Sequence, residues 1–172
     1  MSEYLNPIKG WHKNIANLDF VAVNDSDGGL RIPAGSVCSL KANGKLQLGL
    51  AENAMPLFAF NNSDDYDVAG PAGTNNVVGV FGADVLTLVA TGGYELQSTQ
   101  IKAGQSDGMV IGAFLTAETP DSATAGQLAV GQLYADGICG QVSRVPALNH
   151  NGDIVVSFWA LHLPGVPLST LT

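Results

Sequence analysis

The sequence carries little charge, and positive charge is especially scarce. Asp, Glu, Lys and Arg make up 13% of its 172 residues, where about 25% is usual in globular domains. Seven Lys and Arg stand against 15 Asp and Glu, which gives a formal net charge of −8. Because a surface that binds nucleic-acid phosphates needs clustered cations, we expect no nucleic-acid partner.

Long apolar runs are also absent. The longest apolar stretch, residues 154–166, is interrupted by Ser157, His162 and Pro164, and no run reaches the roughly 18 residues that span a bilayer. The first residues, MSEYLNP, lack the basic and apolar regions of a secretory signal. We therefore expect a protein that is soluble when made, in the cytoplasm, with no membrane partner.

Cysteine is scarce as well. Cys38 and Cys139 are the only two cysteines, and a single pair without a secretory signal is not a disulfide framework. Free cysteine often behaves as a small apolar core residue. The sequence therefore predicts two buried free thiols.

The pattern that is present is that of β-structure. Helical periodicity is almost absent, apolar residues alternate or form short runs, and glycine supplies 21 residues that punctuate them. This pattern predicts an all-β fold, a single-domain antiparallel β-sandwich or β-barrel. Strands are predicted at residues 20–23, 56–60, 77–81, 85–90, 95–99, 109–115, 127–134, 137–145 and 154–163.

Three of these predictions are more specific. Residues 91–94 (TGGY) predict a tight hairpin between the strands at 85–90 and 95–99. The nearly continuous apolar run at 109–115 predicts a strand buried on both faces. The run at 154–161, apolar on both faces and β-branched at its start, predicts the central strand of the core.

A hairpin around Asn43 and Gly44 has a predictable register. A two-residue loop would mix apolar and polar side chains on each face, whereas a loop of residues 42–44 pairs Leu40 with Leu46 and Cys38 with Leu48. Register follows the apolar pattern. The three-residue loop is therefore predicted.

Both ends of the chain lack the alternation of apolar and polar residues that is typical of strands. We therefore predict an N-terminal arm (1–18), a β domain (19–163) and a C-terminal arm (164–172). The first arm can be an irregular strand or frayed terminus. Alternatively, its aromatic residues Tyr4 and Trp11 pack on a neighbouring subunit, since such side chains are favoured interface anchors. The long polar loop at 61–76 is typical of a functional or mobile segment.

One motif resembles a catalytic one. Residues 104–108 (GQSDG) match the G-x-S-x-G pattern around Ser106, but a nucleophile elbow needs a strand before the serine and a helix after it. A strand-like segment follows here, and nothing places His150 or His162 near Ser106. We predict no catalytic residue and no enzyme.

Carboxylates form two short clusters. Residues 25–36 begin like a calcium loop but have Ser36 at the twelfth position, where a carboxylate is required. Asp64, Asp65 and Asp67 form a denser cluster, which either binds calcium or caps loop amides. The three histidines lack metal-ligand spacing, and we predict no metal site and no cofactor.

Two segments carry a resemblance to a known family. One is residues 32–37 (IPAGSV) leading to residues 43–45 (NGK); the other is residues 138–144 (ICGQVSR), followed by Asn149, Gly152 and residues 154–159 (IVVSFW). Both are similar to segments of the small β-rich decoration, or cement, proteins on the heads of tailed bacteriophages.

The resemblance implies a virion structural protein, made in the host cytoplasm and located on the capsid exterior. Such a protein binds the outer surface of the capsid and clamps neighbouring major capsid protein subunits, often as a homo-oligomer, a trimer or dimer. The expected contact residues are Tyr4, Leu5, Ile8 and Trp11 of the N-terminal arm.

Two alternatives stay open. The protein could be another β-structured virion part, such as a tail, baseplate or fibre module. It could instead be a β-sandwich that binds carbohydrate or a small ligand, although aromatic residues at 7% provide few platforms for sugar rings.

Overall fold

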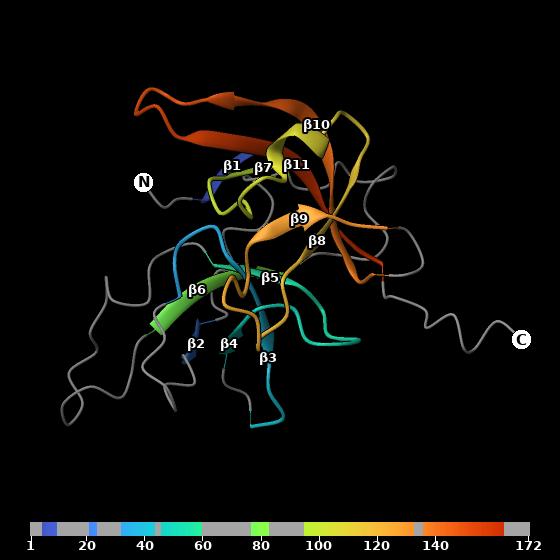
Figure 1. Ribbon diagram of the computed structural model, residues 1–172. Coiled ribbons are helices and arrows are strands. Elements are labelled where there is room, and N and C mark those ends of the chain that lie inside the picture. The colour runs from blue at the N-terminus through green and yellow to red at the C-terminus, as the bar shows by residue number, and fades with distance from the viewer. Residues whose placement is uncertain are drawn as a thin grey trace, which may run out of the picture.

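The protein folds into two antiparallel β-sheets (Figure 1). The computed structural model describes residues 5–9, 21–23, 32–43, 46–59, 77–82, 95–132 and 136–163. Within these ranges the only helical element is the one-turn 3-10 helix η3 (Ser106–Gly108). The all-β prediction is confirmed.

One sheet has six strands and the other has five. The six-stranded sheet has the order β1 (Leu5–Lys9), β7 (Glu95–Ser98), β11 (Ile154–Leu163), β10 (Ile138–Leu148), β8 (Phe114–Ala117) and β9 (Leu128–Val130). The five-stranded sheet has the order β2 (Val21–Val23), β6 (Val77–Gly82), β5 (Leu57–Ala59), β3 (Val37–Leu40) and β4 (Leu46–Leu48). The run at 154–161 does form an inner strand, β11, as its two-sided apolar pattern predicts.

The main core lies between the two sheets. Phe58 of β5 and Phe158 of β11 are fully buried, and their ring centroids are 5.5 Å apart with the planes tilted by 44°. This core takes Val37 and Leu50 from the region of the five-stranded sheet, and its other members come chiefly from the six-stranded sheet and its loops. Apolar faces of both sheets are therefore buried against each other, the arrangement of a β-sandwich.

The alternation of β3 and β5 gives the five-stranded sheet two buried faces. Val37 and Phe58 belong to the main core, whereas their neighbours Cys38 and Leu57 belong to a second cluster. Both cysteines, Cys38 and Cys139, are free and buried, which confirms the predicted thiols. Burial raises the pKa of each thiol to about 12, because a thiolate has no solvation in the apolar interior.

The hairpin β3–β4 has the register predicted from the sequence. Leu40 lies opposite Leu46, and Cys38 lies opposite Leu48. The Ser39 hydroxyl donates a 2.8 Å hydrogen bond to the carbonyl of Gly49. The hairpin is thus fixed by its apolar pairs and by the turn that follows it.

The predicted strand at 109–115 is wrong over its first half. Met109 is buried, but Val110 and Ile111 are 59% and 65% exposed, and a turn precedes β8. Gly112 has a φ of +87°, a conformation that favours glycine. The chain therefore reverses where the apolar run predicts continuous strand.

The predicted hairpin at residues 91–94 is also wrong in its partner. Residues 95–98 of β7 pair with β1 along one edge and with β11 along the other, so neither edge is open to residues 85–90. The segments 85–90 and 91–94 themselves lie outside the described residues.

The proposed arms are described only in part. Leu5–Lys9 of the N-terminal arm forms β1, whose backbone pairs with β7 of the same chain. Residues 164–172 and the loop at 61–76 lie outside the described residues. The boundaries at residues 18 and 163 stay predictions.

Candidate functional site

The four residues expected to contact other subunits have no side chains among the described parts of the structure. Leu5 and Ile8 lie in β1, where the backbone alone is described, and Tyr4 and Trp11 lie outside the described residues. Their role in subunit contacts stays a prediction.

Ser106 does not occupy a nucleophile elbow. It begins the one-turn helix η3, which is followed by a turn and then by β8 rather than by an α-helix. His150 is exposed in the turn between β10 and β11. The arrangement around Ser106 therefore lacks the strand–turn–helix geometry that exposes a nucleophilic serine.

Metal-ligating side chains do not gather in the described part of the chain. Its residues include no group of three or more His, Cys, Asp or Glu side chains that could hold a metal ion. The cluster Asp64, Asp65 and Asp67 lies outside that part, so the calcium hypothesis stays open.

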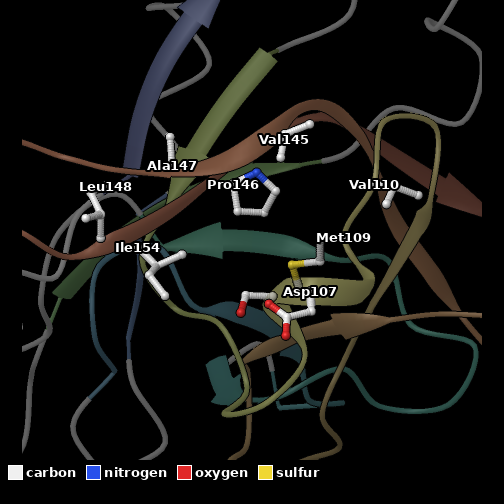
Figure 2. Close-up of a pocket in the computed structure, with 9 residues that line it drawn as sticks. Asp107, Met109, Val110, Val145, Pro146, Ala147, Leu148 and Ile154 are labelled. Atoms are coloured by element: carbon white, nitrogen blue, oxygen red, sulfur yellow. The ribbon is translucent and has the colours of Figure 1, made fainter.

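What the structure does bring together is an apolar groove, between η3 and the hairpin β10–β11 (Figure 2). Its volume is about 460 Å³. It has two polar lining residues and seven apolar ones, and we call this set the hairpin groove: Ser106, Asp107, Met109, Val110, Val145, Pro146, Ala147, Leu148 and Ile154.

The distal half of the hairpin extends past its neighbours in the sheet (Figure 1). Strand β8 pairs with β10 at Gly140 and Gln141, and β7 pairs with β11 only over residues 156–159. Beyond these positions the apolar side chains are open to solvent: Val145 is 62% and Leu148 is 69% exposed. The hairpin therefore presents apolar surface that no described strand covers.

Two irregularities in register explain why consecutive residues of β10 line the groove. Along the hairpin, the register shifts between Val142 and Arg144 and again between Arg144 and Ala147. Each shift places one extra residue on β10, and such bulges bend a strand and redirect its side chains. Pro146 lies within the second shift. Residues 145–148 all reach the groove. The second shift brings in Val145 and Pro146, whereas Ala147 and Leu148 keep the regular register opposite Val155 and Ile154.

A buried carboxylate fixes the base of this hairpin to β7. Glu95 is 2% exposed, and its Oε1 accepts hydrogen bonds from Ser143 Oγ at 2.9 Å and from Arg144 Nε at 3.1 Å. Arg144 Nη2 also lies 3.4 Å from Glu95 Oε2. The first bulge lets two consecutive side chains reach the same carboxylate, so Glu95 sets the direction in which the distal hairpin leaves the sheet.

The opposite wall of the groove is tied to the same strand. The Gly112 N–H donates to the Val142 carbonyl, and the Val142 N–H donates to the Ala113 carbonyl, each at 2.9 Å. The side-chain amide of Gln141 donates to the Gly112 carbonyl at 3.0 Å. Met109, only 1% exposed, forms the floor between the two walls.

Among the described residues, Asp107 is the one charged residue that lines the groove. It is exposed on η3, and Figure 2 shows its carboxylate across from the hairpin residues. No side chain in the described ranges forms an ion pair or a hydrogen bond with it. The groove therefore combines an apolar lining with one carboxylate available to an external cation.

Sequence reasoning missed this groove. Two signals pointed to it: Val110 and Ile111 lie between glycines that turn the chain, and the run at 145–148 (VPAL) breaks strand alternation with a proline. Chemically, the groove offers contact surface and one negative charge. It is suited to binding.

Three comparisons with known proteins give no match: no family, no curated protein and no solved structure resembles this chain significantly. In the part of the chain that the structure describes, no helix has the length and apolar character required to cross a membrane.

Proposed function

We propose that this protein is a virion structural protein that binds the outer surface of a phage capsid and stabilises it by holding neighbouring major capsid protein subunits together. The observation that carries the proposal is the projecting hairpin β10–β11 with its exposed apolar groove.

The exposure of this hairpin supports a macromolecular partner. Val145 and Leu148 are more than half exposed, and contiguous apolar surface of this kind marks interaction sites. The groove lies open on one side of a hairpin. Small-molecule sites are concave and bury most of the surface of their ligand, so an open groove is better suited to the surface of a macromolecular partner. The apolar contact would be repeated over many capsid positions, so each copy needs only modest affinity.

The position of the resemblance agrees with this role. The second segment that is similar to phage decoration proteins, residues 138–144 with Asn149, Gly152 and residues 154–159, lies on β10, the following turn and part of β11. These residues flank the part of β10 that lines the groove, and Ile154 belongs to both. The net charge of −8 suits a surface that faces away from packaged DNA.

Immunogold electron microscopy of phage particles, with antibodies against this protein, tests the proposal. Label spread evenly over the heads would support capsid decoration. Label on tails or baseplates alone would refute it in favour of another virion component. No label on any particle would refute both virion hypotheses and favour the ligand-binding alternative.

A second measurement tests the stabilising role. Heads of a phage mutant that lacks this protein are heated with and without the purified protein, and DNA release is followed by dye fluorescence. We expect added protein to raise the release temperature. An unchanged release temperature, with the protein bound, would refute stabilisation while leaving binding intact.

A further inference from the structure

We propose that the hairpin groove docks a segment of the major capsid protein in which apolar side chains stand next to a Lys or Arg, with the apolar side chains in the groove and the cation at Asp107. This inference rests on the proposed function and names the chemistry that the groove recognises.

The shape and lining of the groove support an apolar side-chain anchor. Its volume of about 460 Å³ lies within the roughly 300–1,000 Å³ of ligand pockets. Val145, Leu148 and Ile154 are 62%, 69% and 47% exposed, so docking would remove much apolar surface from water. Burial of such surface is the main driving force of association.

The backbone of β10 argues against a partner that adds a strand at this position. Pro146 has no N–H to donate, and the register shifts on both sides of Arg144 interrupt the strand. Proline and bulges are the devices by which proteins prevent edge-to-edge pairing. A partner is therefore bound through side chains in the groove.

The charge of the groove selects among partners. Asp107 is exposed, without an ion-pair partner in the described ranges. In the same ranges neither Lys nor Arg lines the groove. A Lys or Arg beside the anchor satisfies this carboxylate. A second copy of this chain, with its own net charge of −8 and a second Asp107, would add like charge. Complementary charges contribute mainly specificity and association rate.

Site-specific crosslinking identifies the occupant. Ala147 lines the groove and is exposed, whereas both native cysteines are buried. In an Ala147→Cys variant, benzophenone maleimide therefore labels only the new thiol under native conditions. The labelled protein is bound to phage heads that lack the wild-type protein, irradiated and digested, and the crosslinked peptide is identified by mass spectrometry.

We expect a peptide of the major capsid protein with apolar residues adjacent to Lys or Arg. A peptide from a second copy of this chain, or an acidic capsid peptide, would overturn the inference. The matched control is Glu52→Cys, an exposed position between β4 and β5, which should not give the same crosslink.

A charge test uses two single substitutions of the same kind. Asp107→Asn removes the carboxylate from the groove, and Asp121→Asn removes an exposed carboxylate between β8 and β9. We expect Asp107→Asn to weaken binding to the heads about 2- to 5-fold at low salt, with a smaller effect at high salt. Asp121→Asn should bind as the wild type does. Equal affinities of the two variants would overturn the assignment of Asp107.

The two proposals fail in different ways. If the wild-type protein does not bind the heads at all, the proposed function fails, and the inference fails with it. If the wild-type protein binds but the crosslinked peptide is not the expected one, or the two charge variants bind equally, the inference alone is overturned.

Discussion

Disrupting the contact between Phe58 and Phe158 is the most direct test of the β-sandwich, because this contact joins the two sheets. Both rings are fully buried, with centroids 5.5 Å apart. Replacing either ring by alanine should lower the free energy of unfolding by about 3–5 kcal/mol, through lost transfer energy and the cavity that remains. The whole free energy of unfolding of a domain is only about 5–15 kcal/mol, and two such losses could unfold the protein. Leucine is therefore the better substitution when both phenylalanines are to be replaced in a double-mutant cycle.

A double-mutant cycle measures the contact itself. Phe58→Leu and Phe158→Leu each keep most of the apolar volume but remove the ring. If the rings touch across the two sheets, the combined loss should differ from the sum of the single losses by about 0.5–1.5 kcal/mol. Urea unfolding followed by circular dichroism gives the four free energies.

Two further results complete this test. The control is Ile111→Ala, a large apolar residue that is 65% exposed, which should change stability by no more than about 0.5 kcal/mol. Additive losses for the two phenylalanines would refute the contact between the sheets.

Three further predictions concern backbone strain and titration. Gly49 has a φ of +102°, and a Cβ there would lie 2.6 Å from Pro120 N, so Gly49→Ala should cost about 3 kcal/mol in urea unfolding. Gly104→Ala, with a φ of +78° and no atom within 4 Å, should cost only about 1 kcal/mol; equal costs would contradict the close approach. Burial raises the pKa of both thiols from 9.0 to about 12. Their contribution to stability is therefore complete below pH 9 and falls by about 1 kcal/mol per thiol at pH 10. A variant with both cysteines changed to alanine should lack this part of the alkaline loss in urea unfolding, and an identical loss would refute the burial effect. The hydrogen bond that Lys102 donates to Glu118, at 2.7 Å, lowers the pKa of Glu118 from 4.5. The stability that this carboxylate contributes is therefore present above pH 4.5, and it is lost as the pH falls through the lowered pKa. Lys102→Met should raise the pKa of Glu118 in an NMR titration, and an unchanged pKa would contradict the pairing.

Local patterns predicted the local structure well. The β3–β4 hairpin follows from the apolar pairs Leu40 with Leu46 and Cys38 with Leu48, because a shift of one residue would turn apolar side chains to the wrong face. The fold class and the inner position of β11 follow from alternation and two-sided apolar runs in the same way.

Non-local features were not predictable from such patterns. Residues 109–115 read as a strand because composition does not reveal that Gly112 adopts a positive φ. The partners of β7 depend on which distant strands reach its edges, which a single sequence does not encode locally. The hairpin groove needs η3 and β10 side by side, together with two bulges in β10. The first bulge lets Ser143 and Arg144 donate to Glu95, a residue about 48 positions earlier in the chain.

The order of strands in the six-stranded sheet has a consequence for synthesis. Strand β11 lies between β7 and β10, so these two strands share no neighbour until residues 154–163 have left the ribosome. Before then, β10 can pair only with β8 in this sheet and β7 only with β1, and Leu5 must wait for Ser98, its distant partner. Sheets built from such non-local pairs fold slowly and expose unpaired edges in the meantime. Chains that stop before residue 154 should therefore depend on chaperones or aggregate.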